Sequence, residues 1–109
     1  MIITTTDGID GRAIADYLGI VSGDAVLGSN IFKDFFASVR DIVGGRTASY
    51  EQLLQEAKDM AIAEMREKAR ALGADAIVGA DLDYEVIGGD RKTMLMVSAN
   101  GTAVKLAQR

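Results

Sequence analysis

The feature that most constrains this chain is an uninterrupted helical segment between Ser49 and Gly73. Ser49 is a favourable N-cap, and Gln52 three residues later completes a capping box. The interior is rich in strong helix formers and contains neither proline nor glycine, while Gly73 supplies the residue type that commonly closes a helix. The pattern predicts a helix over residues 49–72, roughly 34 Å long.

One side of this helix is apolar, so it should pack against the rest of a single domain that spans residues 1–109. Lys58 falls inside the apolar stripe, and its aliphatic stem is expected to run outward past the contact. The stripe consists of Leu53, Leu54, Ala57, Ala61, Ile62, Met65, Ala69 and Leu72.

Two strands and a second helix are predicted before the long helix. The β-branched residues 2–6 indicate a short strand, and residues 13–27 indicate a longer one that Gly19 and Gly23 interrupt. These glycines are best explained as punctuation of the strand; the alternatives are bulges or close contact with another backbone. Residues 31–43 place apolar side chains, including all three phenylalanines, at helical spacing. This favours an accessory helix that packs in the core or at a subunit interface.

After the long helix, residues 74–87 and 92–106 predict two strands of a hairpin. One face of the second strand is apolar and the other is less polar than a plain solvent face, so both should be at least partly covered. A central position in the sheet, or a second subunit, would explain this. In the first strand we expect Ala76, Val78, Ala80, Leu82, Tyr84 and Val86 on one face and Asp81, Asp83 and Glu85 on the other. In the second we expect Leu95, Val97, Ala99, Gly101 and Ala103 opposite Met94, Met96, Ser98, Asn100 and Thr102.

Composition excludes several classes of function. The net charge of −4 argues against nucleic acid as the main partner, because neutralising phosphates needs a basic face. The chain contains no cysteine and no histidine, which excludes disulfides, thiolate or imidazole chemistry and the usual zinc sites. It has neither a signal-peptide pattern nor an apolar run near the roughly 20 residues of a membrane span. We therefore expect a cytoplasmic protein with no membrane partner.

Asp81, Asp83 and Glu85 form the clearest candidate metal site. Alternate residues of a strand share a face, so the three carboxylates should lie in a row, about 6–7 Å apart. Their oxygen atoms suit a hard cation such as Ca²⁺ or Mg²⁺. The simpler interpretation, a solvated strand face that discourages edge-to-edge aggregation, is favoured.

A glycine turn and several arginines suggest an anion site. The turn Gly44-Gly45-Arg46, with Arg12 and Arg40, offers backbone N–H and guanidinium groups to a phosphate or carboxylate. A helix C-cap followed by a structural arginine explains the same residues and is favoured. Asp75 is a further candidate, although a turn aspartate bonded to its own backbone is commoner. The candidate ligand-binding residues are Arg40, Arg46 and Asp75, and no catalytic residue or cofactor is assigned.

Short motifs along nearly the whole chain make it resemble the YbjQ-like family of small bacterial and archaeal proteins, sometimes labelled heavy-metal-binding. They are ITTT at 3–6, LGIVSG at 18–23, RDIVGGR at 40–46, GADAIVGA at 73–80 and GTAV at 101–104. The family usually has a proline where this chain has Asp10, which changes the turn at Ile9-Asp10-Gly11. The resemblance implies a two-layer, dodecin-like β-α-β-β unit assembled into a ring, commonly a pentamer. It does not indicate which activity, if any, such a protein has.

The expected fold is α+β, with a three-stranded antiparallel sheet, the long helix on one face and the accessory helix beside it. Residues 2–6 lack a partner in such a sheet, so they are expected to extend the sheet of a neighbouring subunit. The expected function is a non-enzymatic homo-oligomeric module that binds a small ligand or metal between subunits. The alternatives are an enzyme with an interface active site of carboxylates and arginines, and a purely structural or partner-binding ring.

Because the chain has neither cysteine nor histidine, we expect no tight binding of Zn²⁺, Cu²⁺ or Cd²⁺ by the folded protein. Titration calorimetry at neutral pH checks this expectation. A submicromolar affinity for Zn²⁺ would contradict it, whereas weak binding of a hard cation by the three carboxylates would not.

Overall fold

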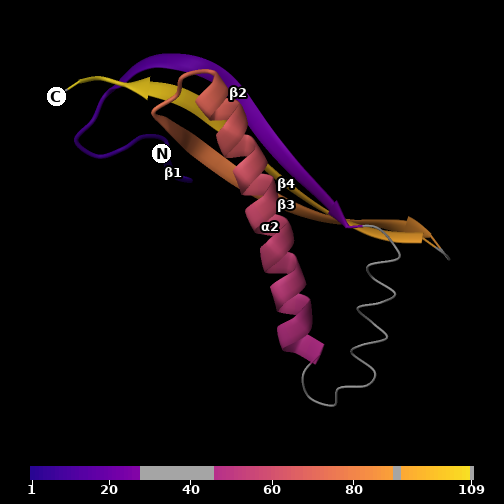
Figure 1. The fold of residues 1–109 in the computed structure, drawn as a ribbon. Helices are drawn as coiled ribbons and strands as arrows, with labels where there is room; N and C mark the ends of the chain where they lie inside the picture. Colours follow the sequence, from indigo (N-terminus) through magenta and orange to yellow (C-terminus); the bar gives the residue numbers. More distant parts are fainter. Residues whose placement is uncertain (28–45, 90–91, 109) are drawn as a thin grey trace.

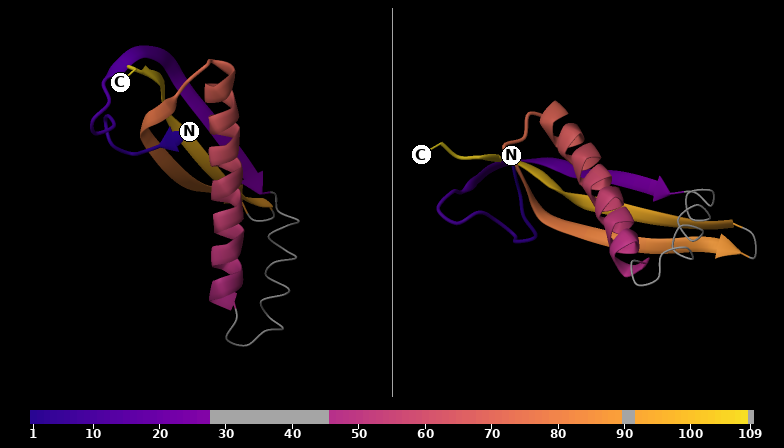
Figure 2. Two further views of the ribbon diagram at one scale, coloured as in Figure 1. Left: turned by 60° about the vertical axis from the view of Figure 1, so that its left-hand side comes forward. Right: turned by 60° about the horizontal axis from the view of Figure 1, so that its bottom comes forward.

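The computed structural model describes residues 1–27, 46–89 and 92–108. In chain order the elements are β1 (Ile2–Ile3), β2 (Ile14–Leu27), α2 (Arg46–Ala71), β3 (Ala76–Gly89) and β4 (Lys92–Leu106). The three long strands lie side by side (Figure 1), and Figure 2 shows α2 crossing one face of them, which gives an α+β fold in two layers. Among these residues, the helix lacks the apolar run that would be needed to cross a lipid bilayer.

The sheet has four strands in the order β1-β3-β4-β2, so the predicted three-stranded antiparallel sheet is wrong. Its antiparallel part is correct, because β4 lies between β3 and β2 and pairs antiparallel with both. The additional strand is β1, which runs parallel to the start of β3, with Ile2 opposite Ala76 and Ile3 opposite Ile77. The central position of β4 explains why every residue from Met94 to Val104 is buried or half-buried.

β1 is shorter than the predicted strand at residues 2–6 because the chain leaves the ladder after Ile3. The Thr4 hydroxyl accepts a hydrogen bond from the backbone N–H of Thr6 (3.2 Å), and local bonds of this kind compete with a strand ladder. A backbone bond from Thr4 N to Ile77 O (3.0 Å) still ties the segment to β3. The premise that residues 2–6 lack a partner in their own sheet is therefore wrong. That they extend a neighbouring subunit's sheet stays a prediction.

α2 packs on β2 and β4 through a line of mostly small side chains. Ala57, Ala61, Met65 and Ala69 recur at four-residue spacing, and each is at most 1% exposed. An ideal Cβ on Gly23 of β2 would lie only 2.1 Å from the carbonyl oxygen of Ala61 and 2.6 Å from the nitrogen of Met65. Gly23 therefore marks close contact between two backbones, which was not the favoured interpretation. The sheet contributes Val21, Ala25, Leu27, Ile77, Leu95, Val97, Ala99 and Ala103 to the same core.

A bulge in β3 reverses which of its side chains face α2. The register passes from Val78 opposite Thr102 to Asp81 opposite Asn100, so β3 has one residue more than β4 here. Gly79 within the bulge has a φ of 61°, a left-handed conformation that glycine adopts without strain. The prediction of one continuous apolar face on β3 is therefore wrong. Before the bulge, Ala76 and Val78 pack with Val104 and Leu106 away from α2; after it, Leu82, Tyr84 and Val86 lie opposite Ala99, Val97 and Leu95 on the α2 side.

Most element boundaries agree with the predictions. The three long strands are confirmed to within two residues at each end. α2 begins three residues before the predicted helix at 49–72 and ends one residue earlier, so Ser49 lies in its first turn and is not the cap. Leu72, predicted in the apolar stripe, is 49% exposed because the helix has already ended. The predicted accessory helix at 31–43 lies outside the described residues.

We expect Gly23→Ala to destabilise the protein, because the added methyl group would meet backbone atoms of α2, which cannot rotate away. The free energy of unfolding, measured by urea denaturation, should fall by about 1–3 kcal/mol or more. Gly8→Ala is the matched control, since a Cβ at Gly8 meets nothing within 4 Å. If both variants were as stable as the wild type, the helix could not lie this close to β2.

Candidate functional site

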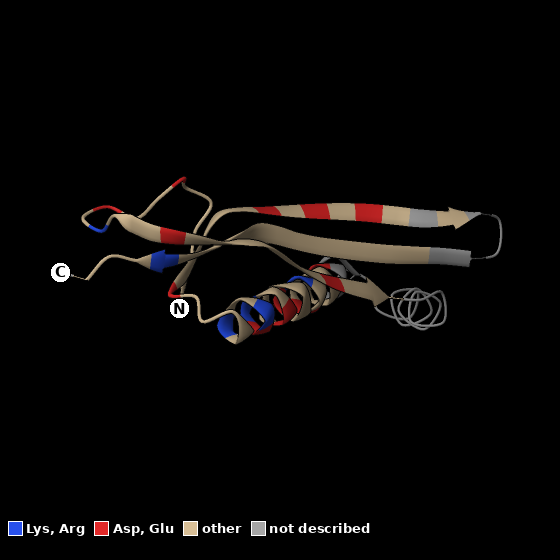
Figure 3. Ribbon diagram, turned by 90° about the horizontal axis from the view of Figure 1, so that it is seen from above, with Lys and Arg blue, Asp and Glu red and all other residues tan. Residues whose placement is uncertain are grey.

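The sheet face that points away from α2, which we call the distal face, carries the predicted carboxylates. We call residues that are paired across the three long strands a row. In the middle row of this face, Ser98 of β4 lies between Asp83 of β3 and Asp24 of β2. Figure 3 shows how acidic positions alternate along β3. Between Met94 and Thr102, the central strand presents uncharged side chains on this face, namely Met94, Met96, Ser98, Asn100 and Thr102. The rows next to Asp83 pair Asp81 and Ser22 with Asn100, and Glu85 and Val26 with Met96.

The three carboxylates of β3 repel one another. The pKa of Asp83 is raised, mainly by the negative charge of Asp81 and more weakly by that of Glu85. Asp81 and Glu85 are four residues apart, about 13 Å along a strand, which is too far to share one cation. Within the described parts of the chain, no group of three such side chains could hold a metal ion. Binding of a hard cation by these residues stays a prediction.

The candidate ligand-binding residues Arg46 and Asp75 lie far apart in the described chain. Arg46 is the first residue of α2, whereas Asp75 follows its last turn, so the helix separates them by about 39 Å. Arg12 lies at the Asp75 end, where its Nη2 donates a hydrogen bond to the carbonyl oxygen of Ala107 (3.2 Å). Arg40 lies outside the described residues. Ligand binding by Arg40, Arg46 and Asp75 stays a prediction, and it would need more than one subunit.

Asp75 has a structural role that is visible in its bonds. Its backbone N–H donates to the carbonyl oxygen of Val104 (2.8 Å). Its Oδ2 accepts a hydrogen bond from the backbone N–H of Leu106 (2.9 Å). The two bonds extend the pairing of β3 with β4 to the end of the sheet. The favoured interpretation, that Asp75 bonds to backbone, is therefore correct in kind. Its partners, however, belong to β4 and not to the turn that contains Asp75.

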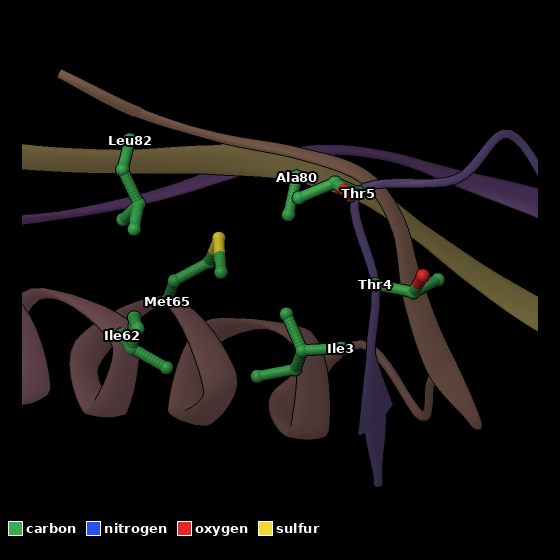
Figure 4. A pocket seen from close by; sticks show the side chains of 7 residues that line it. All are labelled: Ile3, Thr4, Thr5, Ile62, Met65, Ala80 and Leu82. Carbon is green, nitrogen blue, oxygen red and sulfur yellow. The ribbon is translucent and has the colours of Figure 1, made fainter.

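The space between α2 and β3 is hollowed in two places, because the helix packs mainly on β2 and β4 and less on β3. A cavity of about 180 Å³ lies at one end of it, where the side chains of Ile3, Met65 and Leu82 point into the same space (Figure 4). The rest of its lining is Thr4, Thr5, Ile62 and Ala80. A second hollow of about 250 Å³ lies toward the start of α2 and is lined by Glu51, Leu54, Gln55, Lys58 and Tyr84. We call these two hollows together the α2–β3 groove.

The α2–β3 groove was not predicted from the sequence. Three apolar side chains of β3 lie along it. Leu82 and Tyr84 line its two hollows and Val86 lies beyond them, and their exposed fractions are 36%, 50% and 63%. Their orientation follows from the bulge, and the available signal was Gly79, since an isolated glycine in a strand pattern often marks a bulge. Lys58, predicted to run outward past the contact, lines the second hollow, and the direction of its side chain stays a prediction.

Comparison with known proteins gives the family. A family model described as "Putative heavy-metal-binding" matches residues 1–107 of the chain. The chain belongs to the YbjQ-like family, and the resemblance seen in its motifs is confirmed. A crystal structure of a protein of unknown function from Pediococcus pentosaceus, which belongs to the DUF74 family, is similar with a TM-score of 0.63. The two chains are 24% identical, and the match covers 98% of each, so the likeness shows a shared fold.

In this YbjQ-like chain, we expect Asp81→Asn to lower the pKa of Asp83 toward its ordinary value of 3.8, because the strongest repelling charge is removed. The raised pKa means that folded protein holds this proton more tightly than unfolded protein does. The resulting stability is present below pH 3.8 and is lost as the pH rises through the raised pKa. An NMR titration of the Asp83 carboxyl carbon measures the pKa, with Asp16→Asn as the control outside the row. An unchanged pKa in Asp81→Asn would contradict the repulsion.

Proposed function

We propose that this YbjQ-like protein is a non-enzymatic homo-oligomeric module, a closed ring of subunits that binds a metal ion or small ligand. The count of five subunits rests on the resemblance to the family alone. The observation that carries the ring is the presence of two different open edges on one sheet.

The two edges lie at opposite sides of the sheet. β2 is the last described strand on one side, and no residue that the structure describes pairs with its outer edge. On the other side, β1 and the residues after it pair with β3 only as far as Ala80, and no described residue pairs with the outer edge of β3 beyond it. Open edges favour pairing with another chain. A contact between two different edges is head-to-tail, so it closes into a ring or grows into a fibre.

The shape of the subunit also supports assembly. Its radius of gyration is 17.4 Å, whereas a compact domain of this length has a radius of about 13 Å. The α2–β3 groove and the exposed Leu82, Tyr84 and Val86 border the edge of β3 that is open, so a neighbouring subunit that pairs there would cover apolar surface. Burial of such surface is the main driving force of association.

The other functions remain alternatives within the same ring. An enzyme would need a carboxylate and an arginine to meet at an interface, because Arg46 and Asp75 lie at opposite ends of α2. A purely structural or partner-binding ring would need no retained ligand. The cytoplasmic location and the absence of nucleic-acid and membrane partners stay predictions from the composition.

Native mass spectrometry together with light scattering tests the ring, because it reports the subunit count and any retained ligand. We expect Tyr84→Lys to shift the protein toward monomers, since a charge would replace an exposed aromatic side chain beside the open edge. Met60→Lys is the control, because Met60 is 59% exposed on α2 and lies outside the groove. A wild-type protein that is monomeric at micromolar concentration would refute the assembly, and a stable dimer would refute the ring.

A further inference from the structure

The soft metal-binding donors of this chain are its methionine thioethers. The sequence contains five methionines and neither cysteine nor histidine. Met65 is 1% exposed in the core under α2, so its sulfur cannot reach a metal ion from solvent, and Met60 is exposed alone on the helix. Met1 lies at the chain terminus. Met94 and Met96 are the pair that the fold places together.

Met94 and Met96 share the distal face at alternate positions of β4. Their Cα atoms are therefore about 7 Å apart. Each side chain has three rotatable bonds, so the two sulfur atoms can converge on one cation without a change in the backbone. Both residues are half-buried. The strand that carries them is held by pairing, with Met96 between β2 and β3 and Met94 paired with β3.

The surroundings favour a cation at this place. Glu85 is the direct cross-strand neighbour of Met96 on β3, and Asp83 lies one row further along the same face. The net charge of the chain is −4. A thioether carries no charge, so a nearby carboxylate supplies the electrostatic attraction that the two sulfurs lack. Thioether ligands select soft Cu(I) over divalent ions such as Zn²⁺ and Mg²⁺.

We propose that Met94 and Met96 form a two-thioether site for a soft monovalent cation, Cu(I) or Ag(I), with Glu85 as the neighbouring countercharge. The site deepens the metal-binding part of the proposed function and does not require the ring.

Titration of the full-length protein with Ag⁺ in chloride-free buffer tests the site, by calorimetry and by native mass spectrometry. Ag⁺ is the probe because it needs no reductant. We expect one Ag⁺ per subunit in the wild type and no binding in the Met94→Leu/Met96→Leu double variant, since leucine keeps the apolar volume and removes the sulfur. Either single variant, Met94→Leu or Met96→Leu, should lower the Ag⁺ affinity by more than the roughly 10- to 100-fold that is typical when a residue outside the direct ligands is replaced.

Met60→Leu is the matched control, because it removes an exposed thioether that lies outside the pair, and it should bind Ag⁺ as the wild type does. Glu85→Gln should weaken Ag⁺ binding while keeping its stoichiometry. Equal Ag⁺ binding by the wild type and the double variant would overturn the site. In the same spectra, a ring without Ag⁺ would overturn the site alone, and a monomer that holds Ag⁺ would overturn the ring alone.

Discussion

The close contact between α2 and β2 is the constraint on which the rest of the structure depends. Gly23 lets the helix backbone approach the strand. The small side chains of Ala57, Ala61 and Ala69 allow the same close approach from the helix side. A helix that is drawn toward one edge of a sheet cannot also cover the opposite edge. The α2–β3 groove, the exposed apolar side chains of β3 and the free edge beside them all follow from this asymmetry. Close packing thus positions the surface on which the proposed assembly rests.

The bulge at Gly79 is the second determinant of this surface, because it decides which side chains of β3 point into the groove. Without the extra residue, Leu82 and Tyr84 would point to the distal face and the carboxylates would point toward α2. The bulge turns the carboxylates outward, where water screens their repulsion, and turns the apolar side chains toward the groove. The residues after β1 bond at the same place, from Gly79 N to Thr6 O and from Ala80 N to Thr4 O. The irregular end of β1 and the bulge therefore stabilise each other.

The sequence predicts the elements of this fold better than it predicts their contacts. Helix formers without glycine or proline predict α2, and alternation predicts the three long strands, because both signals are local. The parallel pairing of β1 with β3 depends on residues more than seventy positions apart, and no local signal encodes it. For the candidate site, alternation places Asp81, Asp83 and Glu85 together on one face as predicted. The same rise per residue keeps Asp81 and Glu85 too far apart to share one cation. Asp75 forms its hydrogen bonds with backbone groups of β4, which come close to it only once the chain has folded.

The two faces of the sheet therefore differ in chemistry. The α2 side is apolar along β3 and ends at an open edge, which suits contact with another subunit. The distal face carries acidic groups on its outer strands and thioethers on the central strand, Met94 and Met96. Hydrophobic burial drives the first kind of contact without directional preference, whereas a soft cation requires particular donor atoms at a particular spacing. Because these requirements lie on opposite faces, assembly and cation binding can change independently. Substitutions of Met94 or Met96 on the distal face would leave the contact of α2 with β2 untouched.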